Sequence, residues 1–232
     1  PDFVLGASLG EVVGAVVTGM LTVEDALRFV IGQAKVFNNF CLPGGMMAVL
    51  CSPDIYTEYS QMVEGCELSG LNGSEIFVVS GSNAALTRFE AFLKARDIAT
   101  SRLPVSHAFH SRLMDPAKQN FLALLSNVEV KKPHIPMLSC TRVDFAEEVS
   151  HEYFWDVVRK PLNVRDAVQK LLYLGDYVYL DISPSGTMSN LVKYNAKNQT
   201  VPKTLFLLQP FGGESARLQS VVEELKTMFP KP

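Results

Sequence analysis

The pentapeptide Gly6-Ala7-Ser8-Leu9-Gly10 follows the apolar residues Phe3-Val4-Leu5 and precedes a run rich in valine and alanine. A strand that enters a G-x-S-x-G turn and leaves it as a helix forms a nucleophile elbow. The small residues allow the sharp turn that exposes a serine hydroxyl. The N–H groups at the start of the next helix favour negative charge at the same place. This stretch predicts an α/β fold with Ser8 as a candidate nucleophile.

The size and composition indicate a globular protein that contains one large domain with room for a small insert. The chain has 232 residues, 47% of them hydrophobic, and a formal net charge of −3. Acidic and basic residues are mixed without a basic stripe, so we expect no nucleic-acid partner. No apolar stretch is long enough for a membrane span and no signal peptide is visible. We therefore expect no membrane partner and a cytoplasmic location.

The four cysteines show no pattern of a metal site or a disulfide framework. Cys41, Cys51, Cys66 and Cys140 have no C-x-x-C spacing, and no histidine lies at zinc-finger spacing from them. In a chain of this length they are typical of small buried side chains in a reduced compartment. We expect no metal.

The hydrophobic periodicity divides the chain into an outer and an inserted part. Residues 45–106 have the order β-α-β-β-α-β, which predicts a ferredoxin-like small subdomain. Residues 1–44 and 107–232 alternate strands and helices, which predicts an α/β-hydrolase-like core with a parallel sheet. The predicted strands are 2–6, 46–51, 67–71, 76–80, 99–104, 135–139, 177–181 and 205–208. The predicted helices are 9–18, 23–39, 54–63, 83–95, 115–125, 151–159, 164–174, 187–194 and 214–228, with Thr22 and Ser82 as N-caps.

Four segments in the same order resemble the malonyl-CoA:acyl-carrier-protein acyltransferase family. Residues 6–11 (GASLGE) resemble its G-H-S-x-G-E signature, and residues 105–111 (VSHAFHS) resemble the signature that ends in A-F-H-S. Residues 154–162 (FWDVVRKPL) resemble its aromatic-Trp and R-x-P-V segment. Residues 181–186 (DISPSG) resemble its E-x-G-P-G segment. The resemblance covers almost the whole chain.

The resemblance implies a serine–histidine dyad. Ser8 would be the nucleophile and His110 the general base, since a neutral imidazole can accept the serine proton. The backbone N–H of Leu9 would donate to the oxyanion. A backbone carbonyl four residues before the proline of R-x-P orients the base in this family, which predicts the carbonyl of Val157. The family uses no resident cofactor, because the phosphopantetheine arm of the carrier protein, or coenzyme A, arrives with the substrate.

The resemblance also implies partners. The family takes a second oxyanion donor from a loop well before the elbow. We therefore expect a preceding segment that carries it, because losing one such donor reduces the rate by roughly 10²–10³. An acyl carrier protein, acidic in this family, would deliver the acyl thioester. The candidate contacts are Arg112, Lys118, Arg159, Lys160 and Lys193, each of which is otherwise an ordinary solvated charge.

One difference from the family pattern affects which acyl group the protein can bind. Malonyl-transferring members carry an arginine 25 positions after the serine, and this chain has Gln33 there. A neutral amide cannot neutralise the free carboxylate of malonyl, and a buried carboxylate without a cation is strongly unfavourable. We place Gln33 in the substrate pocket; the alternative is a residue on the solvated face of its helix.

Further pocket residues come from both signatures. Ala7 replaces the family's histidine and would leave a smaller, more apolar wall. His107 and Phe109 would line the pocket, with His107 either shaping the acyl site or serving as a simple wall. With Gln33 and these residues, the chain resembles the acyl-hydrolase branch of the family that occurs in polyketide pathways. Members of that branch remove stalled acyl groups from carrier proteins.

Three functions follow from this reading. The first is a proofreading hydrolase acting on acyl-carrier-protein thioesters through an acyl-serine. The second is a transacylase that moves malonyl or another acyl group from coenzyme A to a carrier protein. The third is a non-catalytic docking module for carrier proteins, which the presence of both Ser8 and His110 argues against.

Overall fold

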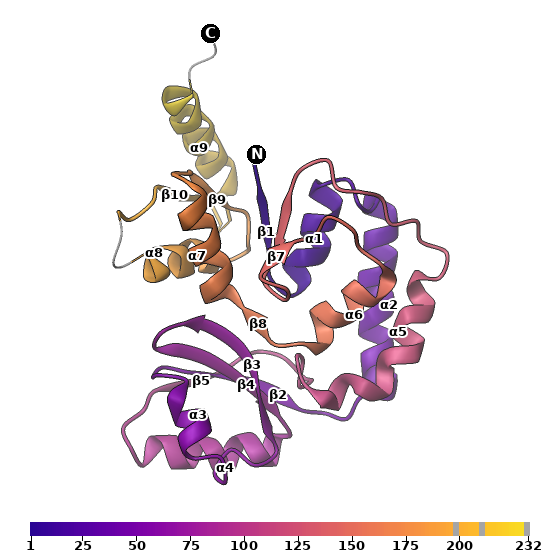
Figure 1. Ribbon diagram of the computed structural model, residues 1–232, viewed down its shortest axis with the longest axis vertical. Coiled ribbons are helices and arrows are strands. Elements are labelled where there is room, and N and C mark those ends of the chain that lie inside the picture. Colours follow the sequence, from indigo (N-terminus) through magenta and orange to yellow (C-terminus); the bar gives the residue numbers. More distant parts are fainter. Residues whose placement is uncertain (197–199, 209–211, 230–232) are drawn as a thin grey trace. The chain divides into compact units, whose positions relative to one another are not determined.

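The chain folds into helices and strands that form two compact units. A computed structural model describes residues 1–196, 200–208 and 212–229 (Figure 1). The units comprise residues 1–167 and 168–232. Parallel and antiparallel strand pairs alternate with helices, which confirms the predicted α/β class. The segment 45–106 lies inside the first unit, and the hydrolase-like and ferredoxin-like descriptions stay predictions.

A three-stranded sheet carries the elbow. It consists of β1 (Val4–Gly6), β6 (Met137–Ser139) and β7 (Asp144–Phe145), in the order β1-β6-β7. β1 and β6 are parallel, whereas β7 pairs antiparallel with β6, so this sheet is mixed rather than purely parallel. β7 has two residues and therefore no periodicity that a sequence could reveal.

Aromatic side chains pack the helices around this sheet into one core. The Phe29 ring lies edge-on to Phe121 and Phe154, with centroids 5.1 and 5.9 Å apart. The side chain of Thr22 accepts a hydrogen bond from the Asp25 N–H, which confirms the predicted N-cap. The helices are α1 (Leu9–Val17), α2 (Val23–Phe40), α5 (Lys118–Leu125) and α6 (His151–Arg159).

A five-stranded sheet forms the other part of the first unit. Its order is β5-β2-β4-β3-β8, antiparallel except for the parallel pair β3–β8. Phe77, Phe89 and Leu86 form a fully buried core between this sheet and α4. The elements are β2 (Gly45–Val49), α3 (Asp54–Glu58), β3 (Cys66–Gly73), β4 (Ile76–Gly81), α4 (Asn83–Lys94), β5 (Thr100–Arg102) and β8 (Leu162–Asn163).

The second unit is smaller. β9 (Tyr179–Asp181) and β10 (Thr204–Phe206) form a parallel pair. The Asp181 carboxylate accepts hydrogen bonds from the backbone N–H groups of Ser183 and Ser189, at 2.7 and 2.8 Å. The helices are α8 (Thr187–Asn195) and α9 (Glu214–Met228), and α7 (Val164–Leu174) crosses the boundary between the units.

Two helices differ from the sequence prediction. α3 ends at Glu58, because among residues 57–65 only Val63 is buried and too few contacts hold further helical turns. The helix expected at 115–125 is split into a 3₁₀ segment, η1 (Arg112–Ala117), and α5. Pro116 lacks the N–H that a continuous helix would need there.

Of the residues that the structure describes, no helix has both the length and the apolar character of a membrane span.

The close approach of β1 and α1 requires a glycine at position 6. A Cβ added to Gly6 would lie 2.7 Å from the Cα of Glu11, whereas one added to Gly10 meets nothing within 4 Å. We expect Gly6→Ala to destabilise the fold by about 1–3 kcal/mol, because backbone must shift. The matched variant Gly10→Ala should be neutral or stabilising by about 0.5–1 kcal/mol. Urea unfolding followed by circular dichroism measures both, and equal midpoints would contradict this account of the elbow.

Candidate active site

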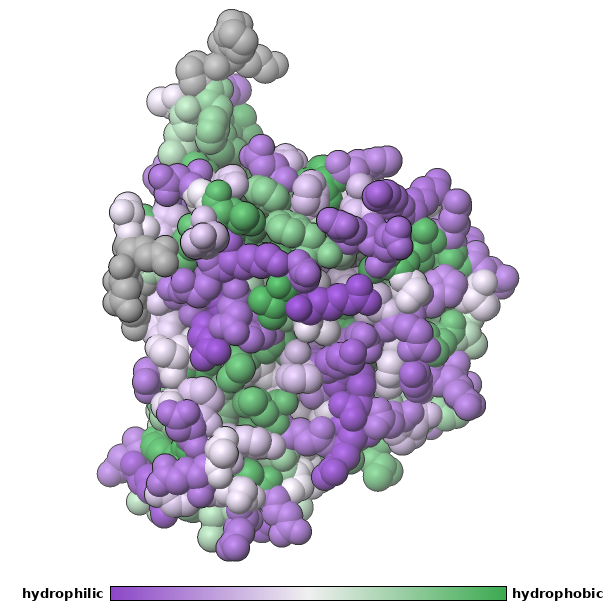
Figure 2. Space-filling model, in the orientation of Figure 1, coloured by the Kyte–Doolittle hydropathy of each residue, from purple (hydrophilic) through white to green (hydrophobic). Residues whose placement is uncertain are grey.

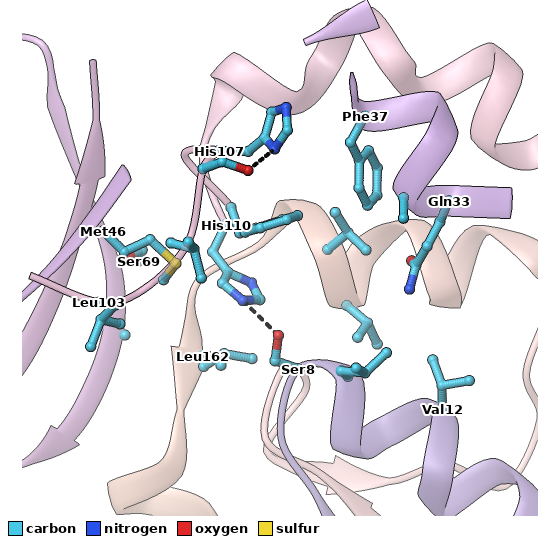
Figure 3. A pocket seen from close by; sticks show the side chains of 18 of the residues that line it. Ser8, Val12, Gln33, Phe37, Met46, Ser69, Leu103, His107, His110 and Leu162 are labelled. Carbon is cyan, nitrogen blue, oxygen red and sulfur yellow. Dashed lines mark hydrogen bonds between the residues drawn. The ribbon is translucent and has the colours of Figure 1, made fainter. Parts of the chain in front are cut away.

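Ser8 occupies a strained backbone position between β1 and α1. Its φ of 54° and ψ of −126° are unusual for a residue with a side chain. Such strain persists only where the surrounding structure holds it, and it is concentrated at functional sites. Ser8 lies at the edge of a cavity and faces His110 (Figure 3).

His110 is held at three atoms. Its backbone N–H donates to the carbonyl of Val158 at 2.8 Å, and its Nδ1 lies 3.0 Å from the carbonyl oxygen of Lys160. A carbonyl oxygen only accepts, so Nδ1 carries the proton and Nε2 is free to accept. Nε2 lies 3.0 Å from the Ser8 hydroxyl, which therefore donates to it (Figure 3). The arrangement is that of a nucleophile and its base.

The carbonyl that holds the histidine belongs to Lys160 and not, as predicted, to Val157. Val157 lies within α6, three residues before Lys160, and its carbonyl is not the one beside Nδ1. Lys160 follows the last turn with an extended backbone, φ −85° and ψ 152°, so its carbonyl is directed away from the helix. Pro161 could have indicated Lys160 from the sequence, because the residue before a proline favours the extended region.

The environment of His110 favours the neutral imidazole. Burial lowers the pKa of His110 to about 4, against the opposing effect of the hydrogen bond to the Lys160 carbonyl. The ring is therefore unprotonated at neutral pH. A neutral imidazole can accept a proton from Ser8, which an imidazolium could not.

Glu11 anchors the elbow helix to the segment after β6. The Glu11 carboxylate is fully buried and accepts from the Thr141 backbone N–H at 3.1 Å and its hydroxyl at 2.8 Å. The Tyr153 hydroxyl donates to the other carboxylate oxygen. Burial raises the pKa of Glu11 above its usual range, and these hydrogen bonds oppose the effect.

Cys140 links the two halves of the site through its backbone. Its N–H donates to the Gly6 carbonyl at 3.1 Å, and its carbonyl accepts from the Asn163 N–H at 2.8 Å. Gly6 precedes the nucleophile, and Asn163 lies three residues after Lys160. The backbone of Cys140 therefore fixes the elbow relative to β8, the strand that follows Lys160.

The cavity beside the dyad has a volume of about 670 Å³. Aliphatic and aromatic side chains from α1, α2 and α6 line one side, and β2, β3 and β4 line the other (Figure 3). Of the described residues that line it, none is Asp, Glu, Lys or Arg. A free carboxylate would find no cationic partner there, so these walls suit an uncharged group.

Three of the four predicted pocket residues line this cavity. Gln33 is 8% exposed and points toward it from α2, and His107 lies on the same side as His110 (Figure 3). Phe109 also lines the cavity. The alternative of a solvated Gln33 is wrong. Ala7 is not among the lining residues, which corrects that prediction. Ala7 lies in the turn between β1 and α1, and this turn directs Ser8 to the cavity.

Leu9 is the first residue of α1, and its side chain is half exposed. The hydrogen bonds of the described residues include none donated by its backbone N–H. Such unpaired groups are expected in the first turn of a helix, where they can bind an anion.

Four of the basic residues predicted to contact a carrier protein are ion-paired. Their partners all lie in the first unit, which reduces the positive charge that they present. The pairs are Arg112–Glu67, Lys118–Glu152, Arg159–Asp115 and Lys160–Asp156. Lys193 lies in α8, in the second unit.

The sequence analysis did not identify several polar residues that line the cavity, among them Asn38, Ser69 and Asn72. Ser69 lies in β3 and is fully buried beside the cavity. Gly70 could have indicated this position from the sequence, because a glycine inside a strand pattern indicates a bulge.

Two proteins from Bacillus are similar to this chain in sequence. The polyketide biosynthesis acyltransferase homolog BaeD of Bacillus velezensis is 33% identical over 225 residues, which cover 97% of this chain and 69% of that protein. The homolog PksD of Bacillus subtilis is 34% identical over 221 residues, covering 95% and 68%.

Solved structures share the fold. The acyltransferase domain from module 8 of the salinomycin polyketide synthase matches with a TM-score of 0.89 and 26% identity, over 98% of this chain and 55% of that one. A malonyl CoA-acyl carrier protein transacylase from Clostridium perfringens matches with a TM-score of 0.81 and 23% identity, over 97% and 71%. The sequence model of the acyl transferase domain family matches residues 1–210, which shows that the chain belongs to that family.

Proposed function

We propose that this protein hydrolyses acyl-carrier-protein thioesters in polyketide biosynthesis and releases uncharged acyl groups as free acids. One observation carries the proposal. The Ser8 hydroxyl donates to the Nε2 of a neutral His110, beside a cavity without a formally charged side chain among its described lining residues.

The chemistry takes two half-reactions. Ser8 Oγ attacks the thioester carbonyl while His110 Nε2 takes the hydroxyl proton, and the Leu9 N–H donates to the oxygen that gains negative charge. The C–S bond then breaks, and His110 returns the proton to the leaving thiol. Water next attacks the acyl-serine ester with His110 again as base, which frees the acid and restores Ser8.

Two observations support the substrate class. Gln33 is neutral and lies in the cavity wall, so a malonyl carboxylate would be buried without a cation. The relatives in Bacillus are named as polyketide biosynthesis acyltransferase homologs. The phosphopantetheine arm, or coenzyme A, is then part of the substrate and not a resident cofactor.

Malonyl transfer is the alternative, because solved structures of the same fold include malonyl-CoA:acyl carrier protein transacylases. The two functions differ in which thioester reacts and where the acyl group goes.

We expect acetyl-carrier protein to give a Ser8 adduct and a steady release of acetate, and malonyl-CoA to load poorly. Intact-protein mass spectrometry and free-acid analysis measure both. Ser8→Ala removes the nucleophile and should abolish the adduct, whereas Ser101→Ala, which changes an exposed serine of β5, should leave it. Rapid malonylation that passes on to a carrier protein would establish the transferase instead.

We expect Gln33→Arg to raise malonyl loading of Ser8 by roughly tenfold or more, because a guanidinium can pair with the carboxylate in a buried site. The matched variant Gln119→Arg adds the same charge on the exposed face of α5 and should not change loading. Equal loading in both variants and the unmodified protein would show that Gln33 does not face the acyl group.

The pH dependence of acylation should reflect the buried histidine. Because the pKa of His110 is lowered to about 4, the base stays neutral and the rate should stay level from about pH 8 to pH 5, then fall by half near that pKa. Rapid-quench acylation measured by mass spectrometry gives this profile.

The same experiment needs a control that shows the protein is folded at each pH. The unfolded chain protonates this histidine at about pH 6.5, so stability declines as the pH falls from there toward the folded-state pKa. Circular dichroism at each pH confirms that the protein remains folded. A rate that halves near pH 6.5 in folded protein would contradict the desolvated base.

A further inference from the structure

Ser69 lies at a bulge in β3 that turns two adjacent residues toward the cavity. In the pairing with β4, Leu68 is opposite Val79 and Gly70 is opposite Val78, which leaves Ser69 as the extra residue. Leu68 and Leu71 both pack against the core between the sheet and α4, although strict alternation would place residues three apart on opposite faces. Ser69 and Gly70 therefore both line the cavity. Bulges often redirect a side chain in this way next to a binding site.

The hydroxyl of Ser69 has no hydrogen-bond partner among the described residues. The side chain is fully buried, and Figure 3 shows it beside Met46 on the sheet side of the cavity. Buried hydroxyls are almost always paired, and an unpaired one needs a reason. Ser80, on the next strand of the same sheet, is equally buried, but its hydroxyl donates to the Phe109 carbonyl at 2.5 Å.

The position of Ser69 suits the arm of the substrate rather than its acyl group. The walls from α1, α2 and α6 are largely apolar, whereas the sheet side adds hydrogen-bonding groups, among them Ser69 and Asn72. A pantetheine arm carries amide groups a few bonds from the thioester sulfur, and an amide satisfies a hydroxyl as either donor or acceptor.

We propose that Ser69 Oγ forms a hydrogen bond with an amide of the substrate's pantetheine arm and so positions the thioester beside Ser8. This proposal rests on the proposed function and adds a recognition residue for the thiol side of the substrate. Ser69 holds the arm and exchanges no proton with the reacting atoms, so it is a positioning residue.

The test compares two thioesters of the same acyl group, one with pantetheine and one with a simple alkyl thiol that has no amide. We expect Ser69→Ala to slow acylation of Ser8 by the pantetheine thioester by roughly 2- to 12-fold, the range for a neutral hydrogen bond. Acylation by the alkyl thioester should not change. Ser69→Thr keeps a hydroxyl and should recover part of the loss. Equal slowing with both thioesters, or no slowing with either, would overturn the proposal.

Stability separates recognition from a structural role. Because the hydroxyl has no partner within the described part of the chain, Ser69→Ala should unfold at a urea concentration no lower than the unmodified protein. Ser80→Ala loses a buried hydrogen bond and should unfold earlier. Early unfolding of Ser69→Ala would show that the hydroxyl supports the fold, and would overturn the proposal.

A failure of the proposed function gives a different result. If the unmodified protein forms no Ser8 adduct with either thioester, acyl transfer through Ser8 is refuted. Calorimetric titration with pantetheine itself then tests Ser69 alone. Weaker binding to Ser69→Ala than to the unmodified protein supports the hydrogen bond, and equal affinity, or no binding to either, overturns it.

Discussion

The hydrogen bond between Ser8 and His110 joins residues 102 positions apart, and its 3.0 Å length depends on how both ends are held. The serine side is fixed by the β1–β6 pair and by the Glu11 carboxylate. The histidine side is fixed by two carbonyl groups at the end of α6, from Val158 and Lys160. Neither support alone sets the distance. The Cys140 backbone touches the strand before the serine and the strand after Lys160, so it holds the two supports in one frame.

Several features of the site are unfavourable for stability. Ser8 and His110 both have positive φ values, which cost of order 1–3 kcal/mol each for residues with side chains. The Ser69 hydroxyl and the Glu11 carboxylate are buried, the first without a partner among the residues that the structure describes. Two hydrophobic cores offset these unfavourable contributions. One is the aromatic core between α2, α5 and α6, and the other lies between α4 and the five-stranded sheet. The two hydrophobic cores therefore stabilise a site that contains two strained residues and a hydroxyl without a partner among the described residues.

Electrostatics decide what the cavity can accept. Desolvation keeps His110 neutral, and it also disfavours any unpaired charge on the acyl group. In the proposed function, Gln33 on α2 favours an uncharged acyl group, because its side chain provides hydrogen bonds without a charge.

The amino-acid sequence by itself determined the elements that depend on local chemistry. The elbow followed from small residues around Ser8, the Thr22 cap from an N-cap residue before an acidic first turn, and α6 and α7 from helical periodicity. The motifs named Ser8 and His110, and their spacing placed Gln33 in the cavity. These features depend on neighbours in the chain, which a sequence displays directly.

Only the tertiary structure decided the features that depend on distant partners. The two-residue strands β7 and β8 exist because other strands pair with them, and Lys160 rather than Val157 supports the histidine because α6 ends before Pro161. The direction of Ser69 follows from a bulge that its pairing with β4 creates. Pairing register, helix ends and desolvation arise from contacts between segments far apart in the chain, so they appear only when the fold brings those segments together.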